Sequence, residues 1–176
     1  MVEPGLFRTA MSQIATPVVV VTAISGERPH GTTVGAFTSL SLDPPMVSVA
    51  LDRQSELLAM LRSAERFGVN VLASDQKALA TTFSKKSPDK FASVDWRPDA
   101  GLPRLPGAAV WLICRTAELL DGGDHVVVLG TVEHAEVDQR SPLVYHDRVF
   151  STVESIPDGV VVSELAGGSK RDHEEA

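Results

Sequence analysis

The chain has 176 residues, of which 43% are hydrophobic and 22% charged, and these values are typical of one soluble globular domain. Its formal net charge of −7 argues against a general nucleic-acid binder, because affinity for nucleic acids comes mainly from neutralised phosphates. The longest apolar run, 17–24, is too short to span a bilayer, and the N-terminus shows no basic, apolar signal. The sequence therefore indicates a cytoplasmic protein.

Helices are predicted at three places. Apolar residues at helical spacing after Pro4 predict a short amphipathic helix, up to Ile14, that covers one end of the core. Ser55 is predicted to cap a helix that Arg62 closes, and Asp75 to cap another with Phe83 on its apolar face.

Most of the remaining chain is predicted as strands. Apolar or alternating runs that predict strands lie at 17–24, 30–45, 46–51, 67–72, 109–119, 126–137, within 142–150, and at 160–162. A Gly-Gly turn joins the two longest runs into a hairpin, whereas 98–107 is rich in proline and glycine and is predicted to be irregular. Hairpins dominate, so we expect a mainly antiparallel β-barrel with a few covering helices. The domain is expected to span 1–163, followed by a charged tail at 164–176.

The stretch 30–45 combines five serine and threonine hydroxyls with Phe37, Leu40 and Leu42. This mixture suits an extended backbone that packs one side inward and offers amides and hydroxyls to a ligand on the other. An ordinary threonine-rich strand is the alternative interpretation.

Other residues with chemical potential are few. Arg53 precedes a helix start and is suited to meet a phosphate, although taken alone such an arginine is more often a solvated strand end. A basic loop lies at 85–90, and His125 begins a strand; by default these are a surface loop and a turn residue. The single cysteine, Cys114, lies in an apolar run and is expected to be a buried structural thiol. The histidines show no metal-ligand spacing, so no metal site is expected.

Several segments, in this order, resemble the flavin reductase-like family of short NAD(P)H:flavin oxidoreductases. They are Gly31-Thr32-Thr33-Val34-Gly35-Ala36-Phe37-Thr38-Ser39-Leu40-Ser41-Leu42-Asp43-Pro44-Pro45, Arg53 and Ser55, Arg66-Phe67-Gly68-Val69-Asn70-Val71-Leu72, Lys86-Ser87-Pro88-Asp89-Lys90-Phe91, Gly123-Asp124-His125, and Leu143-Val144-Tyr145. The match runs from about Phe7 to Phe150.

The resemblance implies a split β-barrel of the FMN-binding, Greek-key type that forms a homodimer. It also implies an NADH-dependent flavin reductase that supplies reduced flavin to a partner monooxygenase. The residues it assigns to flavin are Thr33, Val34, Gly35, Ala36, Ser39, Leu40, Ser41, Arg53, Ser55, Lys90 and Phe91. Those it assigns to NADH are Asp124, His125 and Tyr145.

Some points stay open at this stage. Both FAD and FMN suit the resemblance, with FAD favoured; NADH is favoured over NADPH because no extra basic cluster offers itself to a 2′-phosphate. Relatives often carry Asn or Ser where this chain has Gly35 or Ala36, which would weaken flavin retention by about 1 kcal/mol. The alternatives are an electron carrier that retains its flavin and a non-catalytic barrel for a small ligand.

Overall fold

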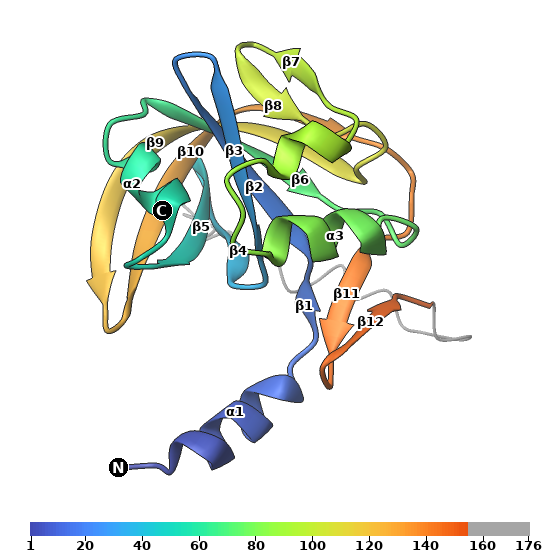
Figure 1. Cartoon of the computed structure of the whole chain (residues 1–176). Coiled ribbons are helices and arrows are strands. Elements are labelled where there is room, and N and C mark those ends of the chain that lie inside the picture. The colour runs from blue at the N-terminus through green and yellow to red at the C-terminus, as the bar shows by residue number, and fades with distance from the viewer. Residues whose placement is uncertain (155–176) are drawn as a thin grey trace, which may run out of the picture.

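The computed structural model describes residues 1–154, which form a curved antiparallel β structure with short helices around it (Figure 1). The strands are β1 (Thr16–Pro17), β2 (Val19–Ser25), β3 (Arg28–Val34), β4 (Phe37–Leu42), β5 (Pro45–Asp52), β6 (Arg66–Val71), β7 (Arg97–Asp99), β8 (Leu102–Arg104), β9 (Val110–Gly122), β10 (His125–Val137), β11 (Leu143–His146) and β12 (Val149–Thr152). The helices are α1 (Pro4–Ser12), α2 (Glu56–Leu61), α3 (Lys77–Ser84) and the 3₁₀ turn η1 (Lys90–Ser93). The predicted mainly antiparallel β architecture is confirmed. The predicted strand at 160–162, the domain boundary at 163 and the tail lie outside the described residues.

Seven strands form the main sheet, in the order β3-β2-β6-β9-β10-β5-β4. Its two edge strands, β3 and β4, follow each other directly in the chain and are joined only by Gly35 and Ala36. The amide of Ala50 on β5 donates to the carbonyl of Ala36 at 3.0 Å, and β3 contacts β5, so the sheet curls back on itself. The prediction of one strand over 30–45 is therefore wrong, because the backbone breaks where it crosses between the two edges.

A second correction concerns 98–107, which was predicted to be irregular. Strands β7 and β8 form a hairpin there, with Asp99 paired to Leu102. Ala100 and Gly101 make its turn at φ 47° and 79°, a left-handed conformation that glycine adopts without strain. The proline content of the segment hid this short hairpin, since proline is tolerated in strands that have a free edge.

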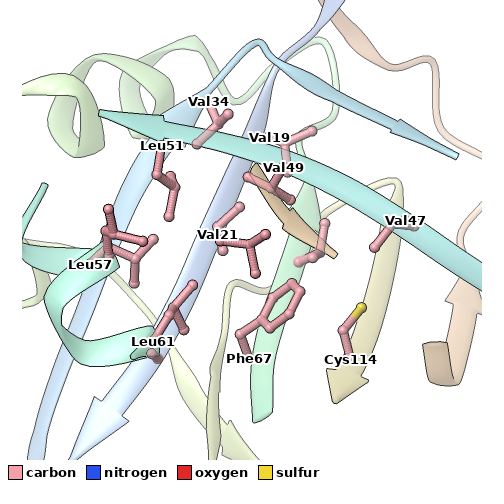
Figure 2. Close-up of a cluster of buried hydrophobic side chains, with 14 of the residues drawn as sticks. Val19, Val21, Val34, Val47, Val49, Leu51, Leu57, Leu61, Phe67 and Cys114 are labelled. Carbon is pink, nitrogen blue, oxygen red and sulfur yellow. The ribbon is translucent and has the colours of Figure 1, made fainter. Parts of the chain in front are cut away.

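The core contains three clusters of buried side chains, and the two larger ones lie on opposite faces of β2. Val19 and Val21 point into the cluster inside the barrel, together with Leu57 from α2 and Phe67 from β6 (Figure 2). Val18 and Val20 belong to a second cluster that also contains Phe83 of α3. The run of four valines, 18–21, thus reflects a segment that buries both of its sides.

Of the two predicted helix caps, the one at α2 is confirmed and the one at α3 is wrong. Ser55 caps α2 as predicted, since its hydroxyl accepts a hydrogen bond from the Leu58 amide at 3.4 Å. Asp75 does not cap α3; the N-cap residue is Gln76, and the Asp75 carboxylate instead accepts a hydrogen bond from the Arg140 guanidinium.

Helix α1 does not cover the core, contrary to prediction. None of its residues is buried, and it extends away from the barrel beyond β1 (Figure 1). Its end is held by the Ser12 carbonyl, which accepts a hydrogen bond from the Asp147 amide at 2.7 Å. Its apolar residues Leu6, Phe7 and Met11 are therefore exposed.

The structural role predicted for Cys114 is confirmed. The thiol is fully buried among core residues, and burial raises its pKa to about 12.

Over residues 1–154, no helix has both the length and the apolar character needed to cross a membrane.

Candidate functional site

A groove of about 690 Å³ opens beside β3. Its walls come from β3 and the Gly35–Ala36 link, from the end of β5 with the first turn of α2, and from the loop that follows α3. His125, the first residue of β10, completes the lining. This volume is within the range of small-molecule and cofactor sites in proteins.

The two faces of β3 have different roles. A Cβ on Gly31 would lie 3.2 Å from the Phe83 ring, and the Thr33 hydroxyl donates to the Ala80 carbonyl at 2.7 Å, so these residues face α3. Because side chains alternate along a strand, His30 and Thr32 point the other way and line the groove. Thr33 also borders the groove, but its hydroxyl is already committed to α3.

The Gly35–Ala36 link offers backbone rather than side chains. Both residues are exposed and line the groove. Within residues 1–154, neither amide donates a turn, loop or side-chain hydrogen bond. A Cβ on Gly35 would approach the Thr16 hydroxyl to 3.1 Å, so a larger residue would crowd this part of the wall. The link therefore presents peptide N–H groups that a ligand can approach closely.

Lys90 lies in the groove wall, but its ammonium is engaged within the protein. The side chain is 6% exposed, and Nζ donates to the carbonyls of Gly31 at 3.0 Å and Phe83 at 2.9 Å. Burial lowers its pKa. Lys90 therefore ties β3 to the end of α3, and this tether shapes the groove.

Besides Arg28, which is ion-paired with Glu56, the exposed cations of the groove lie in the loop that follows α3. Lys85 and Lys86 line the groove together with the hydroxyl-bearing Ser84 and Ser87, and all four residues are exposed. The sequence-based site list contained none of them. A cluster of ammonium and hydroxyl groups at the rim of a groove suits the phosphate groups of a ligand.

A charged cluster lies where β3 meets α2. Glu56 is ion-paired with Arg28 at 2.8 Å, and its second carboxylate oxygen lies 3.8 Å from Nδ1 of His30. The imidazole of His30 is buried, and this burial lowers its pKa. Ser55, predicted as a flavin contact, lines the groove here while its hydroxyl caps α2.

His125 lines the groove, and its neighbour Asp124 orients it. The Asp124 carboxylate lies 2.7 Å from Nδ1 of His125, and this hydrogen bond lowers the pKa of the carboxyl group. Asp124 itself is exposed and does not line the groove.

The structure does not bring Arg53 to the groove. Its guanidinium donates to the Gly123 carbonyl at 2.7 Å and to the Asp121 carboxylate at 2.8 Å. These bonds hold the end of β5 against the tip of the β9–β10 hairpin, so Arg53 is engaged with the hairpin rather than with the groove.

Five further predicted site residues also lie away from the groove. Ser39, Leu40 and Ser41 are on β4, beyond the backbone link, and do not line it. Phe91 is buried in the second core cluster, with its ring centroid 4.9 Å from that of Phe83. Tyr145 lies on β11, against Phe150.

Of the predicted site residues, the groove thus brings together Thr33, Val34, Gly35, Ala36, Ser55, Lys90 and His125. It also contains His30, Thr32 and Glu56, which the sequence analysis did not assign. The alternation of side chains along a strand could have predicted that His30 and Thr32 face the groove while the Thr33 hydroxyl faces the other side. Within the described part of the chain, no group of three His, Cys, Asp or Glu side chains could hold a metal ion.

Several known proteins are similar to this chain over most of its length. The chain is 36% identical over 157 residues to the Mycobacterium tuberculosis "Flavin-dependent monooxygenase, reductase subunit HsaB", covering 87% of this chain and 84% of that protein. It is 40% identical over 156 residues to the Streptomyces pristinaespiralis "NADH:riboflavin 5'-phosphate oxidoreductase", covering 86% and 89%.

A solved structure is similar throughout. The Streptomyces globisporus NADH:FAD oxidoreductase SgcE6, determined in complex with NAD and FAD fragments, superposes with a TM-score of 0.82 at 32% identity. The alignment covers 91% of this chain and 99% of that one. The model of the flavin reductase like domain matches residues 11–154, and the chain therefore belongs to the flavin reductase-like family.

Proposed function

We propose that this protein is an NADH:flavin oxidoreductase that reduces FAD or FMN and supplies the reduced flavin to a separate monooxygenase. The observation that carries this proposal is the groove beside β3, which combines the open backbone of Gly35 and Ala36 with a loop of exposed lysines. Flavin and dinucleotide supply the hydride chemistry, so the protein needs to provide binding, alignment and a dry face.

The two ends of a flavin have different partners in this groove. Val34, Gly35 and Ala36 would hold the ring system mainly through backbone groups, since all three line the same wall while the Val34 side chain packs in the core. Lys85 and Lys86 would receive the phosphate or diphosphate, because their ammonium groups are exposed whereas that of Lys90 is bound to two carbonyls. A charge-assisted hydrogen bond to phosphate contributes about 1.5–3 kcal/mol.

His125 would position the nicotinamide half of NADH. Across the β10–β5 ladder it pairs with Asp52, two residues beyond Ala50, and the Ala50 amide donates to the Ala36 carbonyl. This register supports a role for His125 close to the proposed ring position. The hydrogen bond that the imidazole donates to the Asp124 carboxylate restricts the orientation of the ring, so Asp124 is a positioning residue.

Release of the flavin after reduction is consistent with the residues at the link. Gly35 has no side chain and Ala36 has no polar one, so neither adds a side-chain hydrogen bond to the ring. Each side-chain hydrogen bond that is missing here would weaken flavin binding by about 1 kcal/mol relative to a site that makes it.

A homodimer is part of the proposal. Leu6, Phe7 and Met11 of α1 are 64%, 56% and 44% exposed, and a nine-residue helix that buries nothing is marginal in water on its own. Leu40 and Leu42 on the edge strand β4 are exposed as well. A second copy of the chain would cover these surfaces. Analytical ultracentrifugation measures the mass of the particle in solution and so shows whether the chain is a dimer.

The decisive experiment measures loss of NADH absorbance by the purified chain with and without added FAD or FMN. The proposal predicts oxidation that depends on free flavin and a protein that is colourless after gel filtration. A yellow protein with little turnover would instead indicate a flavin-retaining electron carrier. Absence of flavin binding in calorimetry would leave only a non-catalytic small-ligand barrel.

A further inference from the structure

The imidazole of His30 lies in the wall of the groove, although the proposed mechanism does not use it. His30 is 4% exposed and is on the groove-facing side of β3. Its Nδ1 lies 3.8 Å from a carboxylate oxygen of Glu56 in the first turn of α2. The imidazole therefore lies beside the first turn of α2.

The imidazole retains hydrogen-bonding capacity toward the groove. Neither ring nitrogen makes a hydrogen bond to another of the described residues. Among those residues, Trp111 Nε1 is the one fully buried side-chain nitrogen or oxygen without a partner. The ring nitrogens of His30 are thus not sealed inside the protein. Because Nδ1 lies beside the Glu56 carboxylate, we infer that Nε2 is the nitrogen that meets a ligand.

The surroundings favour the neutral form of this ring. Burial lowers the pKa of His30, and the positive charges of Lys90 on η1 and Arg28 on β3 act in the same direction. The negative charge of Glu56 opposes them. A neutral imidazole is suited to an uncharged polar group, whereas the lysines of the loop are suited to phosphate.

The distance between His30 and the proposed position of the flavin ring indicates which part of a substrate can meet His30. His30 precedes Val34 by four residues on an extended strand, which corresponds to about 13 Å at 3.3 Å per residue. This span exceeds the length of the tricyclic flavin ring. A group that reaches His30 would therefore come from the part of a substrate beyond its ring. That part includes hydroxyl groups in both substrates, those of the ribityl chain in the flavin and those of the riboses in NADH.

We propose that His30 and Glu56 form a hydroxyl-binding site in the groove, in which Nε2 of His30 hydrogen-bonds a sugar-type hydroxyl of a substrate. The site rests on the proposed function, since the ring position at Val34 to Ala36 sets the distance. The hydroxyl belongs either to the ribityl chain of the flavin or to a ribose of NADH. Glu56 restricts the orientation of the imidazole and is a positioning residue.

The test compares riboflavin with lumiflavin, which has the same ring but no ribityl hydroxyls, by fluorescence titration without NADH. The variants are His30→Ala and His30→Gln, whose amide keeps a hydrogen-bonding group, and Glu56→Gln. His146→Ala, an exposed histidine on β11 outside the groove, is the control. The KM for NADH is measured separately at saturating FMN.

If the hydroxyl is that of the flavin, His30→Ala raises the Kd of riboflavin at least fivefold and that of lumiflavin less than twofold. If it belongs to NADH, the KM for NADH rises at least fivefold while both flavin Kd values stay within twofold. In either case His30→Gln restores part of the loss, and Glu56→Gln produces a smaller change of the same kind.

Two outcomes would overturn the site. Changes within twofold for riboflavin and NADH alike would show that no substrate contacts His30. Equal losses for riboflavin and lumiflavin would show that the substitution only disturbs the groove. Failure of the proposed function is distinct, since it appears as a wild-type protein that oxidises no NADH with any flavin.

Discussion

Lys90 provides the sharpest prediction, because the structure gives its ammonium a role within the protein. Lys90→Met keeps most of the apolar stem but removes the donors that serve the Gly31 and Phe83 carbonyls. Hydrogen bonds from a charged group contribute about 1.5–3 kcal/mol each, and relief of the buried ammonium's desolvation offsets part of that loss. We expect the free energy of unfolding to fall by about 3 kcal/mol.

The assay is thermal unfolding followed by circular dichroism. For a domain of this size, the loss corresponds to a decrease in Tm of about 6–12 °C. Lys86→Met is the matched control, because it removes the same ammonium from an exposed loop and should change stability by no more than about 0.5 kcal/mol. An unchanged Tm for Lys90→Met, together with lost FMN binding, would refute the tether and return Lys90 to the ligand.

Four further predictions follow from the groove. Lys86→Ala should weaken FMN binding by about 1.5–3 kcal/mol and leave riboflavin, which has no phosphate, unchanged in a fluorescence titration; equal losses would remove Lys86 from the phosphate site. His125→Ala should raise the KM for NADH more than the KM for flavin in steady-state assays, and an equal effect on both would contradict its role. Arg53→Ala should leave the flavin Kd within twofold, because its guanidinium is engaged with the β9–β10 hairpin; a tenfold loss in calorimetry would contradict this placement. Burial lowers the pKa of His30, so as the pH falls below about 6.5 the unfolded chain binds a proton before the folded one does, and the free energy of unfolding decreases. Urea unfolding at pH 7 and pH 5 should therefore show a smaller decrease for His30→Gln than for the wild type, and an equal decrease would contradict this linkage.

Local sequence alone predicted most of the longer strands and the turn between the two longest, but neither the break at Gly35–Ala36 nor the β7–β8 hairpin. The alternation in 126–137 and the Gly-Gly turn before it predicted the β9–β10 hairpin, which the structure contains as Val110–Gly122 paired with His125–Val137. The Ser55 cap was equally readable, because a cap is satisfied by an amide only three residues away. Features of this kind depend on neighbours in the chain, so a short window of residues is sufficient to specify them.

The roles of individual site residues depended on partners far away in the sequence. The Thr33 hydroxyl faces α3 because it donates to Ala80, 47 positions later, and Lys90 is held by Gly31, 59 positions earlier. Arg53 is directed to the hairpin by Asp121, 68 positions later. The sequence showed which side chains could bind a ligand. Only the tertiary structure decided which of them were already satisfied within the protein, because a buried polar group bonds whatever partner the fold brings within reach.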